Sequence, residues 1–216
     1  MPLRIDAWDD DDGLIAGAAA SRETKIRVVR PAGVSVVLGS GSKPEKELAI
    51  DACRADGVRV ARRRAGGCSV VLDAGNLVVS IARPVDGLGG IQSHFRLFTA
   101  WICDALSSLG LPGCTRDGVS DLARDGRKVG GSGVFRKKGL LYYSTTLLVE
   151  PRIDLIERYL LHPPREPEYR NGRPHREFLA TLGGAPRFWR ARALNARLAA
   201  ELTPERLESF AASRDS

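Results

Sequence analysis

The sequence predicts an α+β domain in which a mixed β-sheet is flanked by helices. Three observations support this prediction. Short β-rich segments bounded by glycine and proline crowd the first half of the chain, a long amphipathic helix stands near its middle, and helical patterns dominate its last third. With 216 residues, of which 43% are hydrophobic and 27% charged, the chain is long enough for one globular domain with a substantial core.

The first half of the chain is predicted to contain strands around one helix. Segments 25–29 and 34–38 are short, β-rich and bounded by glycine and proline, which is typical of strands. The sequence Ser42-Lys-Pro-Glu45 has the form of a capping box, so a helix is expected to begin there and to end at Gly57. Three further strands are expected after it, at 58–61, 70–72 and 77–81.

The middle of the chain carries the clearest helical pattern. Between Ile91 and Leu109 the apolar residues Ile91, Phe95, Phe98, Ile102, Ala105 and Leu109 share one stripe, and Gly110 ends the helix. Strands are then expected at 119–123 and 128–135. A turn at 137–139 leads into a hairpin strand at 140–149, and another helix begins at Pro151.

The last part of the chain changes in composition at His162. Residues 162–174 are polar and rich in proline, so we expect an extended surface loop. Helices are predicted over 186–202 and 203–213. The expected organisation is an acidic N-terminal segment over 1–24, with Asp9 to Asp12 solvated, a catalytic domain over 25–162, and a tail over 163–216 that packs on the same domain.

Charge and composition narrow the classes of function. The net charge of +7 and the pI near 9.6 favour an acidic partner or a phosphate-bearing ligand. No basic motif is interleaved with aromatic residues, so nucleic acid is not the expected partner, and a solvated arginine-rich face is the simpler interpretation. The chain has no apolar run long enough for a membrane span and no signal peptide, which indicates a cytoplasmic protein. Four cysteines without a CxxC pair predict free thiols and no metal site.

The first candidate motif runs from Arg62 to Asn76. Arg62 and Arg63 precede Gly66-Gly67, whose backbone can approach a ligand closely and point N–H groups at an anion. Guanidinium groups beside them suit phosphate or carboxylate. For an isolated glycine pair, the simpler interpretation is a turn between strands with solvated arginines.

The second candidate motif is Asp125-Gly-Arg-Lys128-Val-Gly-Gly-Ser132-Gly. A turn at its start delivers Lys128 onto a strand, and the glycines remove side chains around that lysine. A single lysine in such a place can balance the charge that develops on a phosphate. Taken alone, the motif also fits a loose hairpin with an exposed lysine.

Together, in this order and at this separation, the two motifs resemble the lipoate-protein ligase family, part of the biotin/lipoate ligase and octanoyltransferase superfamily. The family block RR-x-S-GGG-A-V-x-H-D-x-GN is similar to residues 62–76. The family's long helix is similar to the helix expected from Ile91, and its N-D-L block is similar to residues 120–122. Its GRK-[IV]-x-GS block is similar to residues 126–132, and its hairpin is similar to residues 140–148. The resemblance covers about residues 25 to 160 and implies the biotin/lipoate-ligase-type catalytic fold.

The resemblance also implies a reaction and a site. Lipoate or octanoate would be joined to a lysine of a lipoyl-carrier protein, either a lipoyl domain or a glycine-cleavage H-like protein, through an acyl-adenylate, with ATP and Mg²⁺ required. Lys128 would contact the acyl carbonyl and the phosphate, Arg63 and Gly66-Gly67 would line the pocket, and Asn76 and Asp121 would hold the nucleotide side. The other expected binding residues lie in the same blocks: Arg62, Cys68, Asp73, Gly75, Ser120, Gly131, Ser132 and Tyr143. A separate accessory subunit is also plausible.

Four positions depart from the family pattern and keep two alternatives open. Cys68 replaces a glycine, Leu72 a histidine and Ser120 an asparagine, and the family's HHGT becomes Tyr142-Tyr143-Ser144-Thr145. One alternative is an ATP-independent octanoyl or lipoyl transferase that forms a thioester on Cys114, 14 residues before Lys128, with Lys128 or Arg116 lowering the thiol pKa. Cys114 also fits an incidental loop cysteine. The second alternative is a non-catalytic relative that only binds a lipoylated carrier or an acyl ligand.

Overall fold

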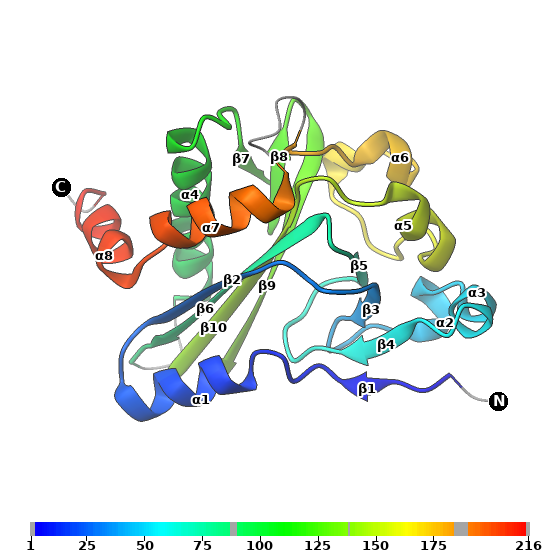
Figure 1. Ribbon diagram of the computed structural model, residues 1–216, viewed down its shortest axis with the longest axis horizontal. Coiled ribbons are helices and arrows are strands. Elements are labelled where there is room, and N and C mark those ends of the chain that lie inside the picture. The colour runs from blue at the N-terminus through cyan, green and yellow to red at the C-terminus, as the bar shows by residue number, and fades with distance from the viewer. Residues whose placement is uncertain (1–2, 87–89, 138, 184–189, 215–216) are drawn as a thin grey trace.

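The computed structural model describes residues 3–86, 90–137, 139–183 and 190–214, which form two β-sheets (Figure 1). The larger sheet is antiparallel, in the order β2-β6-β10-β9-β8-β7. Its strands are β2 (Lys25–Val29), β6 (Asn76–Pro84), β7 (Thr115–Asp117), β8 (Asp121–Arg124), β9 (Arg127–Lys137) and β10 (Leu140–Leu148).

The smaller sheet has the order β1-β4-β3-β5 and is mixed. Its strands are β1 (Asp6–Ala7), β3 (Ser35–Leu38), β4 (Arg59–Arg62) and β5 (Val70–Leu72). The predicted α+β class is confirmed.

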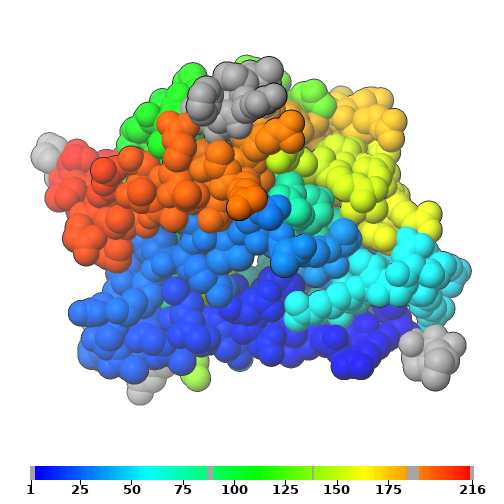
Figure 2. Space-filling model, in the orientation of Figure 1, coloured from blue at the N-terminus to red at the C-terminus, as the bar shows by residue number. Residues whose placement is uncertain are grey.

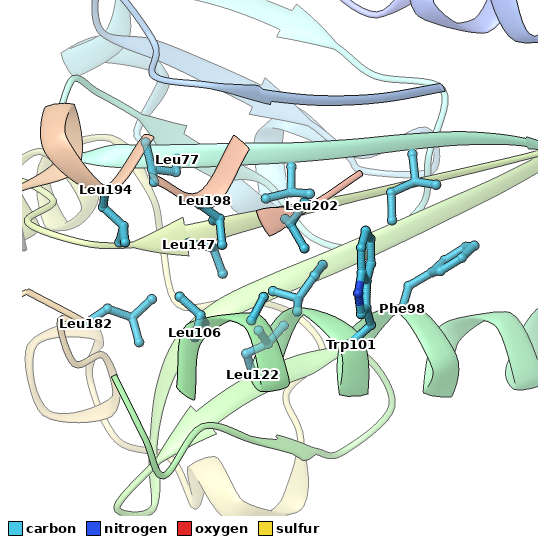
Figure 3. Close-up of a cluster of buried hydrophobic side chains, with 14 of the residues drawn as sticks. Leu77, Phe98, Trp101, Leu106, Leu122, Leu147, Leu182, Leu194, Leu198 and Leu202 are labelled. Carbon is cyan, nitrogen blue, oxygen red and sulfur yellow. The ribbon is translucent and has the colours of Figure 1, made fainter. Parts of the chain in front are cut away.

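One face of the larger sheet carries the main hydrophobic core. Alternate residues of β6 and β10, such as Leu77 and Leu147, point toward this face, as the period of two in a strand requires. They pack against α4 (Ile91–Ser108) and α7 (Ala191–Glu201), with α8 (Pro204–Ala212) completing the layer. Figure 3 shows side chains of α4 and α7 converging on these strands. The helices therefore occupy this face, and the opposite face of the sheet is left to form the site.

The opposite face looks toward the smaller sheet and the N-terminal helix. Helix α1 (Asp12–Ser21) contacts β2, β6 and β10. A second core joins the smaller sheet to α3 (Ile50–Ala55), α5 (Ile153–Tyr159) and α6 (His175–Phe178). In the space-filling view the blue N-terminal segments run along the molecule beside the orange C-terminal helices (Figure 2). Ends of the chain that are distant in sequence thus enclose the same central strands.

Several predicted elements are confirmed. The strands at 25–29 and 70–72 coincide with β2 and β5, and the helix predicted from Ile91 ends one residue earlier than expected. The hairpin is formed by β9 and β10. Residues 186–189 of the predicted late helix and Lys138 of the predicted turn lie outside the described residues, and α7 begins at Ala191.

The prediction of one capped helix after Ser42 is wrong. The segment is divided into α2 (Pro44–Glu47) and α3, and Leu48 between them forms a bridge with Leu160. The Ser42 side chain does not cap the helix. Its hydroxyl donates instead to the buried Glu47 carboxylate, at 2.9 Å. Because Glu47 faces inward to hold a neighbouring loop, the chain turns at Leu48 and does not continue the helix.

Two segments expected to be exposed are partly buried. Asp11, expected in a solvated segment, is 5% exposed and forms an ion pair with Arg27. The predicted loop at 162–174 contains a 3₁₀ turn, η1 (Glu168–Arg170), and Arg170 is 3% exposed. Both segments pack over the face opposite α4, so they belong to the site. In the described part of the chain, every helix is too short or too polar to cross a lipid bilayer.

Candidate functional site

Two connected cavities lie between the sheets and the segments that cover them. The small cavity has a volume of about 140 Å³ and the large one about 520 Å³. Eleven residues line both: Gly67, Cys68, Ser69, Val70, Ser120, Asp121, Lys128, Gly131, Ser132, Gly133 and Thr146. The junction of the cavities is therefore built from the two glycine-rich motifs that the sequence singled out.

Lys128 lies at this junction. Its Nζ is 2.7 Å from Asp121 Oδ1 on the neighbouring strand, and its side chain is 28% exposed. The Tyr169 hydroxyl donates to the second carboxylate oxygen of Asp121 at 3.1 Å. Lys128, Asp121 and Ser120, predicted from separate blocks, are thus brought together, and Tyr169 was not predicted.

A β-bulge gives Lys128 its direction. The pairing of β8 with β9 shifts between Leu122 and Ala123, which leaves Val129 as the extra residue on β9. Val129 is fully buried in the core, whereas Lys128 faces the cavities on the same side as Gly131 and Gly133. A bulge changes the alternation of side chains locally, so it places the lysine over the glycines.

The glycines leave room that no other residue would leave. A Cβ at Gly131 would lie 2.9 Å from the Nζ of Lys128, and one at Gly133 would lie 3.0 Å from the carbonyl oxygen of Gly66. Both distances are shorter than an ordinary contact. Gly131 therefore leaves the space that the end of the Lys128 side chain occupies, and Gly133 lets the loop at Gly66 approach β9 closely.

Arg62 and Arg63 hold the first motif in place through the backbone. Arg63 donates to the carbonyl oxygens of Val37, Gly66 and Cys68, at 3.1, 2.9 and 2.9 Å. Its side chain lines the small cavity, and burial lowers the pKa of its guanidinium. Arg62 lies outside both linings and donates to the carbonyl oxygens of Gly39 and Ser42. Of the two arginines, only Arg63 presents its side chain to a cavity.

Glu47 is a buried organiser that the sequence analysis missed. Its side-chain oxygen Oε2 accepts hydrogen bonds from the backbone N–H of Ser69 and from its hydroxyl, each at 2.7 Å, and from Ser42. Glu47 is 5% exposed. The sequence around Glu47 does not distinguish it from a solvent-exposed glutamate of a helix, because its hydrogen-bond partner Ser69 lies 22 residues later.

Residues 163–174, which we call the strap, cover the large cavity. Arg165 and Arg170 of the strap and His175 at the start of α6 line it. Arg170 packs over the Phe178 ring at 4.8 Å, and its Nε donates to the Arg173 carbonyl oxygen at 2.9 Å. Its buried Nη2 has no hydrogen-bond partner. A buried guanidinium nitrogen without a partner favours an anionic ligand at this place.

The turn at Asp73–Asn76 lies outside both cavity linings. The Asp73 carboxylate accepts from the N–H groups of Gly75 and Arg152, at 2.6 and 2.9 Å, and the Asn76 side chain accepts from the N–H of Asp73 at 2.7 Å. A Cβ at Gly75 would lie 1.9 Å from the Glu150 carbonyl oxygen. These three residues, expected to bind ligand, instead join β5 to β6 and anchor the start of α5.

Tyr143 faces the core and not a cavity. It is fully buried, and its hydroxyl lies 2.8 Å from Ser132 Oγ and 3.3 Å from Thr99 Oγ1. The neighbouring Tyr142 lines the small cavity. Consecutive residues of a strand point to opposite faces, so Tyr142 lines the cavity and Tyr143 packs in the core.

Cys114 lies away from both cavity linings as well. Its Sγ is 3.3 Å from Cys103 Sγ of α4, and it packs against the main core. The hydrogen bond with Cys103 lowers the pKa of the Cys114 thiol, and the nearby charge of Arg124 adds to this effect. The charges of Lys128 and Arg116, expected beside it, are not among the causes. The cysteine that does face the cavities is Cys68.

His175 provides a pH-dependent prediction. Burial, with the charges of Arg170 and His162, lowers its pKa from 6.5 to about 4. Because the unfolded chain binds this proton near pH 6.5 and the folded chain does not, His175 is expected to lower the stability as the pH falls from 6.5 to 4. Urea unfolding at pH 7.5 and 5 measures the effect. The His175→Gln variant should lose less stability than the wild type over this range, and parallel losses would contradict the assignment.

The described residues contain no group of three or more His, Cys, Asp or Glu side chains that could hold a metal ion. The junction instead offers one ammonium group, one carboxylate and a glycine-lined floor between two cavities whose walls combine apolar and charged side chains. This arrangement suits a ligand with an apolar end and an anionic end, whose reacting atoms lie beside Lys128.

Comparison with known proteins identifies the family of this chain. Residues 8–183 match the family model described as the lipoyl protein ligase A/B catalytic domain. A lipoate-protein ligase of Bacillus subtilis is 32% identical over 122 residues, which cover 56% of this chain and 36% of that protein. The chain spans between 36% and 60% of the lengths of the curated relatives it matches first.

Solved structures agree in fold. A bipartite lipoate-protein ligase from Thermoplasma acidophilum, studied together with its E2 lipoyl domain, has a TM-score of 0.69 and 23% identity, with 98% of this chain and 89% of that chain covered. A lipoate-protein ligase A bound with ATP has a TM-score of 0.68 and 23% identity, with 93% and 86% covered. The family expected from the two motifs is thus confirmed by a match that spans most of the chain, and the chain belongs to the lipoyl protein ligase A/B catalytic domain family.

Proposed function

We propose that this chain attaches lipoate or octanoate to a lysine of a lipoyl-carrier protein through an acyl-adenylate. The observation that carries the proposal is the position of Lys128, whose Nζ lies at the junction of the two cavities, 2.7 Å from Asp121. An acyl-adenylate has an apolar chain and a charged nucleotide on either side of one carbonyl–phosphate linkage. Its two halves match the two cavities.

The small cavity suits the acyl chain. Its walls include the apolar side chains of Ile15, Val37, Leu72, Val78 and Phe135. Burying a chain of methylenes against such walls is favourable in proportion to the area removed from water. The carboxyl end of the acid then lies toward Lys128.

The large cavity suits the nucleotide. Arg165, Arg170 and His175 line it, and the unpartnered Nη2 of Arg170 supports a phosphate-bearing ligand. The ATP-bound structure with the same fold supports ATP as the co-substrate. Mg²⁺ usually enters such sites with the phosphates and binds one or two carboxylates, and Asp121 is the carboxylate at the junction.

The proposed reaction has two steps. A carboxylate oxygen of the acid attacks the α-phosphorus of ATP, forming the acyl-adenylate, and pyrophosphate leaves. The neutral amine of the carrier lysine then attacks the acyl carbonyl, the nitrogen releases one proton to solvent as the amide bond forms, and AMP leaves with the bonding electrons. In both steps negative charge develops on oxygens beside the anhydride, and in this proposal the ammonium group of Lys128 stabilises it.

The carrier and a second subunit are also part of the proposal. The fold shared with a bipartite ligase studied with its E2 lipoyl domain supports a lipoyl domain as acceptor and a separate accessory subunit as partner. The net charge of +7 would attract an acidic carrier and raise the rate of encounter.

The direct test is ATP–pyrophosphate exchange, measured with lipoate and octanoate side by side, followed by transfer to a lipoyl domain detected by mass. We expect exchange that depends on the acid and a mass increase of one acyl group on the carrier. Absence of exchange in the folded chain, with and without an accessory subunit, would overturn the adenylate route.

The position of Cys114 predicts that its thiol is dispensable. Because this cysteine lies outside both cavity linings, Cys114→Ser should retain acyl transfer within about twofold of the wild type. Intact mass after incubation with octanoyl-carrier should show no acyl group on Cys114. An acylated Cys114, together with loss of transfer in the serine variant, would instead establish the thioester route.

A further inference from the structure

The floor of the small cavity is a channel of defined length. Three residue pairs of β9 and β10 follow one another along it: Gly131 with Thr146, Gly133 with Ser144, and Phe135 with Tyr142. The first two pairs carry small or short side chains, and the third is aromatic. A strand rises about 3.3 Å per residue, so the aromatic pair lies roughly 13 Å from the Gly131 end.

The aromatic pair closes the channel. The rings of Phe135 and Tyr142 have centroids 5.8 Å apart, and Tyr142 is 6% exposed. Helix α1 covers this end, since Ile15 and Ala18 pack in the same cluster as the two rings. The chain therefore meets a wall at this point, whereas its other end opens at Lys128.

Hydrogen bonds of the Tyr142 hydroxyl hold the wall in place. The Tyr142 hydroxyl donates to Asp11 Oδ2 at 2.5 Å and lies 3.3 Å from Ser80 Oγ, and Asp11 is paired with Arg27. Burial raises the pKa of Tyr142, so the hydroxyl remains a donor at neutral pH. Because the hydroxyl is occupied, an acyl chain would contact ring carbons, and no polar group is needed at the end of the chain.

We propose that Tyr142, held by Asp11 and backed by Phe135, sets the upper limit of acyl-chain length. This inference rests on the proposed function. The seven C–C bonds of an extended eight-carbon chain, each about 1.5 Å long and zigzagged, span roughly 9 Å. That length fits between Lys128 and the aromatic pair, whereas a twelve-carbon chain, at roughly 14 Å, does not. The site is thus matched to octanoate and to lipoate, whose carbon chain has the same length.

The test measures binding of octanoate, decanoate and dodecanoate to the full chain by calorimetry. The wild type is expected to bind octanoate and decanoate and to exclude dodecanoate. Tyr142→Ala should open the wall, and each further methylene that becomes buried adds roughly fourfold in affinity, so dodecanoate should gain roughly fifteenfold relative to decanoate. Phe135→Ala should shift the preference in the same direction. It also serves as the second opening variant if loss of the Tyr142–Asp11 contact impairs folding.

A shortening variant and a matched control complete the design. Ser144→Leu fills the channel one pair closer to Lys128 and should weaken octanoate binding relative to hexanoate. Tyr143→Phe changes the adjacent tyrosine on the opposite face of β10 and should keep the wild-type order of chain lengths. If the folded variants keep the wild-type order while octanoate still binds, the inference is overturned and the proposed function stands. If no acid binds to the folded wild type, both are overturned.

Discussion

Replacing Lys128 with alanine is expected to reduce lipoate-dependent pyrophosphate exchange and carrier acylation by about two to three orders of magnitude. Among the described residues, Lys128 is the only lysine whose side chain lines either cavity, and it lies at the junction of the two. Without it, charge that develops on the carbonyl and phosphate oxygens would lose the cation at the junction and would still face the Asp121 carboxylate. The loss should appear mainly in kcat, because the group acts on the transition state.

Two further variants test whether the effect depends on the ammonium charge and on its position at residue 128. Lys128→Met keeps a long side chain without the ammonium group and should be as impaired as the alanine variant. Lys137→Ala removes an exposed lysine from the same strand and should stay within about twofold of the wild type. Exchange at wild-type level in Lys128→Met would show that Lys128 does not stabilise the reacting oxygens.

Substitution of Gly39 by alanine is expected to have the second largest effect, on both stability and ligand binding. A Cβ at this position would lie 1.8 Å from the Gly67 carbonyl oxygen and 3.1 Å from Ser42 Oγ. The nearest atom is backbone, so the loop that carries Gly67 must move. Ser40 N–H also donates to the Ala65 carbonyl oxygen at 3.0 Å, which ties the two loops together. We expect a loss of about 3 kcal/mol in the free energy of unfolding.

The matched control for this prediction is two residues away. A Cβ at Gly41 would meet no atom within 4 Å, so Gly41→Ala should unfold at nearly the wild-type urea concentration. Octanoate binding should fail in Gly39→Ala at temperatures where circular dichroism still shows a folded chain, since Gly67 lines both cavities. Equal urea midpoints of unfolding for Gly39→Ala and Gly41→Ala would mean that the loop at Gly67 accommodates a Cβ at position 39 without cost.

Local patterns in the sequence predicted much of the fold. The β-rich segment at 25–29 and the apolar stripe that begins at Ile91 became β2 and α4, because each pattern is repeated within a few residues. The resemblance to the ligase family, carried by the two glycine motifs and the block at 120–122, also implied that Lys128, Asp121 and Gly67 belong to one site. Their chemistry is local: a lysine and glycines on a strand, and arginines before a glycine turn.

Tertiary structure decided which neighbours these groups have. Glu47 is separated from Ser69 by 22 residues, and Asp11 from Tyr142 by 131, so no short pattern marks either pair. The choice between Tyr142 and Tyr143 depends on which face of β10 looks toward the smaller sheet, and the direction of Lys128 depends on a bulge against β8.

The sequence by itself therefore determined the family, the class of fold and the lysine at the centre of the site. Only the tertiary structure decided that Cys114 and the Asp73 turn stand apart from the cavities, that the Nη2 of Arg170 in the strap is buried without a hydrogen-bond partner, and that an aromatic pair ends the channel. The physical reason is that a motif records the chemistry and local conformation of a few neighbouring residues. The walls of a cavity depend on side chains from distant segments, and packing and register bring them together.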